Sequence, residues 1–141
     1  MRDSSLIFPM LAMVFLTAFV LVRLFRSRVR AVREGRTKTG YYRIYQGDLE
    51  PEYSAKPARH FSNLFEAPTL FYAACLAAMV TRTTGPATLT FAWAYVAARV
   101  AHAYVHLGRN ELRPRIAAFF SGWAVLLAMW TWIAVRVATT S

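Results

Sequence analysis

The chain contains 141 residues, 57% of them hydrophobic, and carries a formal net charge of +10. This length predicts a single domain, and so high a hydrophobic content is unusual for a soluble domain of this size. The positive charge does not indicate nucleic-acid binding, because most Lys and Arg residues lie between long apolar blocks. The single cysteine, Cys75, excludes an internal disulfide, and its apolar neighbours predict a small buried hydrophobe instead of a catalytic thiol.

Four apolar blocks are long enough, or nearly so, to cross a bilayer, which takes roughly 20 residues of helix. We therefore predict an all-α integral membrane protein, a single domain over residues 1–141 folded as a bundle of four transmembrane helices. The first block is interpreted as a helix and not as a secretory signal peptide, since a basic run follows it instead of a small-residue cleavage site. Pro68 falls inside the second helix and is expected to kink it. The helices are expected at roughly residues 5–26, 58–81, 86–107 and 115–136.

The basic residues predict the orientation of these helices. Most of them follow the first helix, in or next to the loop at residues 27–57, and several more lie between the third and fourth helices. Short loops rich in Lys and Arg stay in the cytoplasm, so both loops are expected there and both chain termini on the opposite side. Contact with anionic lipid is a further role for the same charge.

Two of the predicted helices carry polar residues at depths where burial is expensive. In each helix three such residues are spaced so that they share one face. Glu66 and Arg99 both lie roughly 10–13 Å inside the boundary, and antiparallel packing would let them face each other or a wet cleft. Residues in this position are candidates for function, or they form a buried network that only fixes helix register. The polar residues are Arg59, Asn63 and Glu66 in the second helix, and Arg99, His102 and His106 in the third.

Other roles for these residues stay open. His102 and His106, with Glu66 as a third ligand, have the spacing of a metal site. Two histidines on one helix face are more often hydrogen-bonded, however, so no metal is expected. Glu66 would suit a proton-coupled transporter, but Arg99 favours its charged form. The arginines between the third and fourth helices either hold an anionic ligand or simply follow the positive-inside rule. They are Arg109, Arg113 and Arg115.

The arrangement resembles the MAPEG family, the membrane-associated proteins in eicosanoid and glutathione metabolism. The resemblance covers most of the chain. Its most specific part is Arg59-x3-Asn63-x2-Glu66 at the start of the second helix, which is similar to the family's glutathione-contacting pattern. A second part is the segment ARVAHAYVHLGRNELRPR, in which Arg99 and Arg113 stand at arginine positions of the family. The resemblance is with the bacterial-type branch, which implies a homotrimer in the bacterial inner membrane with glutathione bound between subunits.

The same resemblance implies a role for each candidate residue. Arg113 would be the catalytic residue that stabilises the glutathione thiolate, and Arg99 would add positive potential beside it. His102 and His106 would line the glutathione site, at positions where eicosanoid-pathway members tend to have tyrosines; this departure argues against a dedicated eicosanoid enzyme. The residues that would bind the peptide part of glutathione are Arg59, Asn63 and Glu66.

We therefore expect a glutathione-dependent transferase or peroxidase that acts on hydrophobic electrophiles or lipid hydroperoxides. The alternative is a non-catalytic membrane protein of the same fold that binds lipid or a thiol. Glutathione is the expected co-substrate, and another low-molecular-weight thiol would suit the same arginines. The expected partners are membrane lipids, a hydrophobic small molecule and further copies of the chain, with no nucleic acid.

Overall fold

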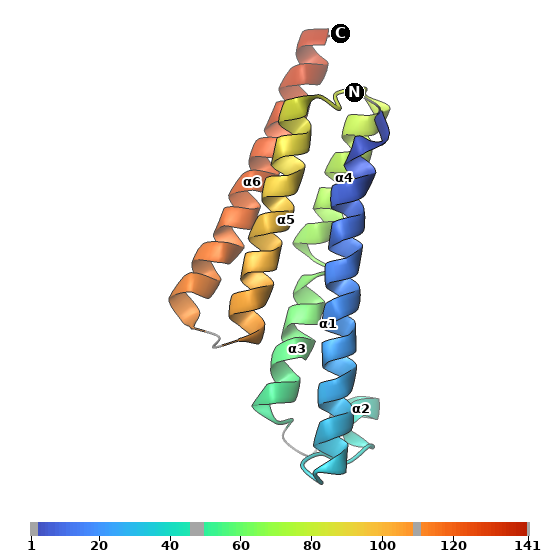
Figure 1. The fold of residues 1–141 in the computed structure, drawn as a ribbon, viewed down its shortest axis with the longest axis vertical. Helices are drawn as coiled ribbons and strands as arrows, with labels where there is room; N and C mark the ends of the chain where they lie inside the picture. Colours follow the sequence, from blue (N-terminus) through green and yellow to red (C-terminus); the bar gives the residue numbers. More distant parts are fainter. Residues whose placement is uncertain (1–2, 46–49, 109–110, 141) are drawn as a thin grey trace.

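The computed structural model describes residues 3–45, 50–108 and 111–140, and every regular element within them is a helix. Figure 1 shows α1, α4, α5 and α6 side by side, with α3 continuing the line of α4 and both chain ends at the same end of the bundle. We call the opposite end, toward which the α1–α3 and α5–α6 connections lie, the loop end. The elements are η1 (Asp3–Leu6), α1 (Ile7–Arg33), α2 (Tyr41–Ile44), α3 (Glu52–Asn63), α4 (Ala67–Val80), α5 (Pro86–Leu107) and α6 (Leu112–Thr140).

The first long helix extends further than the apolar block that predicts it. α1 continues through the basic stretch to Arg33 and ends where Gly35 adopts a φ of +66°. The backbone N–H of Gly35 donates to Val32 and that of Arg36 donates to Ala31, which is the hydrogen-bond pattern of a glycine-terminated helix. The predicted loop at residues 27–57 is correspondingly shorter, because its first part belongs to α1 and its last part to α3.

The second predicted helix is two helices in the structure. α3 ends at Asn63 and α4 begins at Ala67, so the prediction of one helix kinked at Pro68 is wrong. The break lies just before the proline, and Pro68 occupies the first turn of α4. A proline is tolerated there because that turn needs no backbone donor. The consequence for the site is that the backbone between α3 and α4 is non-helical in the middle of the bundle.

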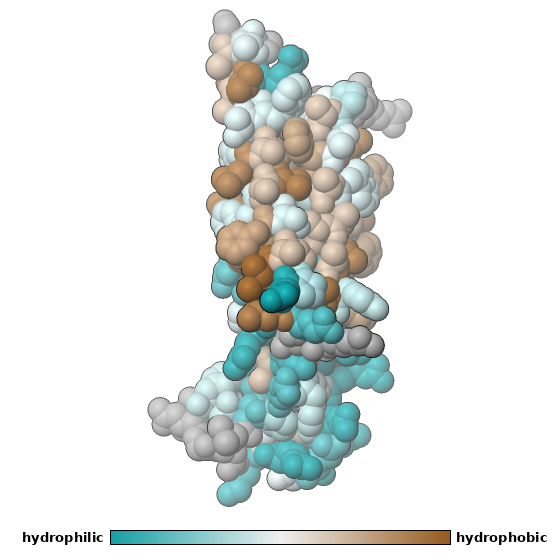
Figure 2. All heavy atoms as spheres, turned by 90° about the vertical axis from the view of Figure 1, so that its left-hand side faces the viewer, coloured by the Kyte–Doolittle hydropathy of each residue, from teal (hydrophilic) through white to brown (hydrophobic). Residues whose placement is uncertain are grey.

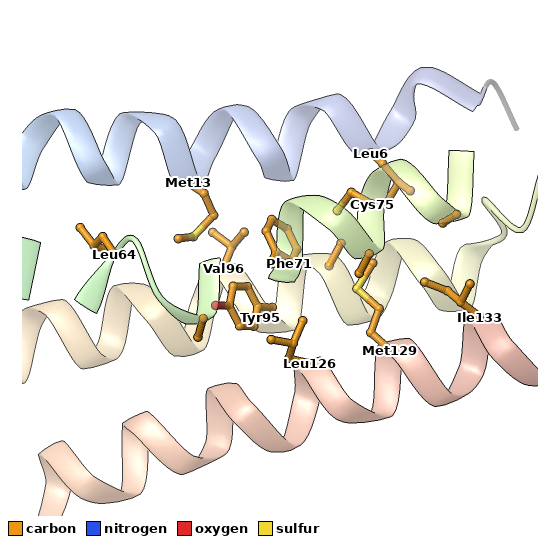
Figure 3. Close-up of a cluster of buried hydrophobic side chains, with 14 of the residues drawn as sticks. Leu6, Met13, Leu64, Phe71, Cys75, Tyr95, Val96, Leu126, Met129 and Ile133 are labelled. Atoms are coloured by element: carbon orange, nitrogen blue, oxygen red, sulfur yellow. The ribbon is translucent and has the colours of Figure 1, made fainter. Parts of the chain in front are cut away.

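Most of the buried core lies between α1, α4, α5 and α6 on the side of this break toward the chain ends, and Leu64 adds to it from the break itself (Figure 3). Phe71 of α4 stacks on Tyr95 of α5, with 4.6 Å between ring centroids and 15° between the planes. Leu126 and Met129 of α6 are buried in the same cluster. α5 packs most extensively on α6, and α1 packs on α3. This packing fixes α5 against both the broken helix and α6.

Three segments in the part of the chain that the structure describes are long and apolar enough to cross a membrane: Ser4–Arg33, Glu52–Val80 and Leu112–Thr139. α5 is not among them; its charged and histidine residues reduce its mean hydropathy. Figure 2, viewed from the α6 side, shows apolar residues over the body of the molecule and polar residues gathered toward the loop end. A fourth crossing by α5 stays a prediction.

Candidate functional site

A pocket of about 540 Å³ opens where α3, α5 and the start of α6 meet. Its polar wall contains two arginines, an asparagine, a serine and two histidines, and its apolar wall is formed by α6. Five of the candidate residues named from the sequence therefore reach one cavity: Arg59, Asn63, His102, His106 and Arg115. The complete lining is Arg59, Ser62, Asn63, His102, His106, Arg115, Ile116 and Phe119.

Helical spacing explains why these residues meet. Arg59 and Asn63 are one turn apart on α3, and His102 and His106 are one turn apart on α5, so each pair shares a face. α6 adds Arg115 and, one turn later, Phe119. Since α5 packs on both α3 and α6, these three faces converge.

Arg99 does not line the pocket and has a structural partner. Its side chain is only 1% exposed, and its Nη2 donates to the backbone carbonyl of Asn63 at 3.1 Å. Asn63 is the last residue of α3, and carbonyls at a helix C-terminus have no partner within their own helix. A guanidinium there also interacts favourably with the negative end of the helix dipole. Arg99 therefore ties α5 to the break between α3 and α4.

Glu66 does not form the predicted ion pair with Arg99. It lies in the break, is exposed, and is not part of the pocket lining. Among the described residues no ion pair joins Glu66 to Arg99, because the guanidinium is directed at the Asn63 carbonyl. The helix break is the physical reason: it ends the face that Glu66 would share with Arg59 and Asn63 in a continuous helix.

The two loop arginines that the structure describes differ in environment. Arg113 is exposed in the first turn of α6 and does not line the pocket, whereas Arg115 is partly buried and does. The backbone carbonyl of Arg115 lies 3.2 Å from Nδ1 of His102. Arg109 lies outside the described residues. The structure thus brings Arg115, and not Arg113, to this pocket.

Sequence reasoning missed one residue, His60. It is fully buried, and its ring centroid lies 5.4 Å from that of His102 and 5.1 Å from that of His106. A signal for it was available. The sequence predicts residues 66 and 99 at equal depth on antiparallel helices. Six positions before residue 66 is residue 60, and six positions after residue 99 is residue 105, so these two also lie at equal depth. His60 therefore belongs between His102 and His106.

A second cavity of about 680 Å³ lies between α1, α2 and α3, nearer the loop end. Arg28 lies in its wall, donates to the Tyr45 hydroxyl at 3.1 Å and stacks over the ring of Tyr42 at 4.9 Å. Arg59 and Ser62 line both cavities. The α3 face that carries Arg59 is therefore shared between two polar cavities.

Long apolar helices around a polar pocket define an integral membrane protein with a ligand-sized cavity. A profile of the MAPEG family matches residues 6–135, which is nearly the whole chain, and the chain belongs to this family. No curated protein and no solved structure gives a match.

Proposed function

We propose that this chain is a glutathione-dependent transferase or peroxidase that acts on hydrophobic electrophiles or lipid hydroperoxides. Membership of the MAPEG family, which includes such enzymes, supports the reaction class. The observation that carries the assignment is the pocket between α3, α5 and α6, where two arginines and an asparagine share a wall with buried histidines.

The chemistry of the lining fits glutathione. Its two carboxylates are planar anions of the kind that guanidinium groups bind through paired hydrogen bonds, and Arg59 and Arg115 supply such groups. Asn63 and Ser62 add neutral donors and acceptors for the peptide bonds. The volume of about 540 Å³ lies inside the range of roughly 300–1,000 Å³ that small-molecule sites occupy. Another low-molecular-weight thiol with carboxylates would use the same groups.

In this proposal the polar residues of the pocket hold the thiol and favour its ionised form. A nearby arginine lowers the pKa of a bound thiol, and the thiolate is the attacking species. Ile116 and Phe119 give the pocket an apolar wall, against which a membrane-dissolved electrophile would be positioned beside the sulfur. The proposal assigns thiolate stabilisation to an arginine at the start of α6, with Arg113 favoured by the resemblance and Arg115 by the geometry.

The proposal includes a homotrimer with four crossings per chain and the loop end in the cytoplasm of a bacterial cell. Large apolar side chains exposed along α1 and α6, such as Phe15 and Phe120, support contact with lipid or with neighbouring copies. Glu66 is exposed in the break and would contact glutathione from the adjoining subunit.

The test is a titration of reduced glutathione into purified, detergent-solubilised protein, followed by the ultraviolet absorbance of the thiolate. We expect a saturable signal at neutral pH that is lost when Arg59 is replaced by Ala. Turnover is then measured with a panel of electrophiles and hydroperoxides. If neither glutathione nor any other thiol gives a thiolate signal, the proposal is contradicted.

A second candidate, a non-catalytic lipid- or thiol-binding protein of the same fold, is favoured by the histidines. His102 lies in the pocket wall with its Nδ1 directed at the Arg115 carbonyl, so this part of the wall offers no tyrosine hydroxyl to a thiol. Saturable binding without product from any member of the panel supports this candidate over the enzyme.

A further inference from the structure

We propose that His60, His102 and His106 form a site for one divalent transition-metal ion of the zinc type, at the wall of the pocket. Nothing in the proposed thiol chemistry requires such a site, so this inference goes beyond it. All three histidines of the chain are in this cluster, although they come from two helices and His60 lies 42 positions before His102 in the sequence.

The geometry suits a metal ion. One ligand nitrogen from each ring lies within 4.8 Å of those of the other two. Zinc–nitrogen bonds of about 2.0–2.1 Å at tetrahedral angles place such nitrogens roughly 3.3 Å apart. Closing the difference takes modest rotations of the side chains. Three imidazoles plus an open fourth position is the ligand set of one class of catalytic zinc sites.

The hydrogen bonding of the cluster is incomplete without a bound group. His60 is 0% exposed, and both of its ring nitrogens are buried with no hydrogen-bond partner. Nε2 of His102 and Nδ1 of His106 are also buried without a partner. Buried polar atoms are almost always paired, because leaving them unpaired is costly. A single metal ion provides a partner for one nitrogen of each ring.

One of the rings is already oriented as a ligand. Nδ1 of His102 lies 3.2 Å from the Arg115 carbonyl, which only accepts, so Nδ1 is the donor and Nε2 carries the lone pair. This second hydrogen bond to a backbone carbonyl is typical of metal-bound histidine and fixes its tautomer. The free Nε2 is also the nitrogen that lacks a partner.

The positive charge around the cluster favours an anion as the fourth ligand of the ion. Arg59 and Arg115 line the same pocket as His102 and His106, and Arg99 is one turn from His102 on α5. This positive environment disfavours a bare dication, so the ion needs an anionic fourth ligand. The pocket gives an anion access to His102 and His106. Glu66, the third ligand considered from the sequence, is exposed on the break and is replaced in this role by His60.

The site is tested on the full chain, purified through a tag without histidine and titrated with Zn²⁺ and Co²⁺ in thiol-free buffer that contains chloride. We expect one ion bound per chain, and a Co²⁺ visible spectrum of tetrahedral type. Replacing His60, His102 or His106 singly by Gln is expected to weaken binding at least tenfold, since even the loss of an outer-shell partner weakens a site 10- to 100-fold. The matched control is Cys75→Ser, which removes a buried sulfur in the core and is expected to leave metal binding unchanged.

Two results overturn the proposal: wild-type protein that binds neither ion stoichiometrically, or binding that persists in all three Gln variants. If a variant fails to fold, X-ray absorption of zinc-loaded wild-type protein decides, because it counts the imidazole ligands directly. Fewer than three imidazoles per zinc contradicts the site. Thiol binding is measured separately on chelator-treated protein, so failure of the metal site and failure of the thiol site are distinguishable.

Discussion

The two arginines at the start of α6 allow a sharp test of where the thiol binds. Arg115 is partly buried in the pocket wall, and Arg113, two residues earlier, is exposed outside it. A hydrogen bond between charged groups in such a wall contributes about 1.5–3 kcal/mol, which corresponds to a loss of roughly 10- to 150-fold in affinity. An exposed ion pair contributes about 0–1 kcal/mol, or at most about fivefold.

We therefore expect Arg115→Ala to weaken glutathione binding by roughly 10- to 150-fold and Arg113→Ala by less than about fivefold. The assay is the thiolate titration at fixed detergent and ionic strength. Arg115→Lys is the matched control: it keeps the charge but not the paired geometry, and is expected to recover part of the affinity. Both substitutions at this position retain the backbone carbonyl that meets His102.

The opposite ranking would refute this reasoning. A large loss in Arg113→Ala with Arg115→Ala unchanged would mean that the thiol lies against the outer surface of the chain, between neighbouring copies, as the family resemblance implies. Equal and negligible effects would remove both arginines from the site.

Three further predictions concern stability. Phe71→Ala, at a fully buried core position, is expected to destabilise the fold by about 3–5 kcal/mol, measured by thermal unfolding in detergent; a loss below about 1 kcal/mol contradicts the packing. Gly35→Ala is expected to lower the free energy of unfolding by about 1 kcal/mol in the same assay, because a side chain at φ +66° is strained although no atom lies nearby. Gly40→Ala is the control, since Gly40 does not have a positive φ. Glu34 accepts hydrogen bonds from Arg30 at 2.7 Å and Tyr53 at 2.8 Å, and the Arg30 bond is the largest cause of its lowered pKa. The Glu34 carboxylate therefore stabilises the folded state fully above its ordinary pKa near 4.5, and this contribution is lost as pH falls through its lower pKa in the folded protein. Over this pH range wild-type protein should lose stability faster than Glu34→Gln.

Part of the site was accessible from sequence because it depends on helix periodicity. The spacing of Arg59 and Asn63, and that of His102 and His106, places each pair on one face wherever the helices lie. Packing of α3 against α5 then brings the two pairs to one cavity. The prediction fails at Glu66, because periodicity holds only while the helix continues and α3 ends at Asn63.

The sequence did not predict where the break between α3 and α4 lies. Pro68 signals an interruption, but the sequence does not say whether a proline kinks a helix or begins a new one. The Asn63 carbonyl at the end of α3 accepts a hydrogen bond from Arg99, which lies 36 positions further along the chain. Long-range hydrogen bonds of this kind are invisible to local pattern analysis.

By itself, the sequence determined that this is an all-helical membrane protein, since the length and hydropathy of its apolar segments are local properties. Its match to the MAPEG profile over residues 6–135 determined the family. It also determined which polar residues share a helix face. Only the tertiary structure decided that Arg115 reaches the pocket while Arg113 does not, and that one ligand nitrogen of His60 lies within 4.8 Å of those of the other two histidines. Both results depend on how separate helices rotate and slide against one another, and that is fixed by packing between side chains far apart in the chain.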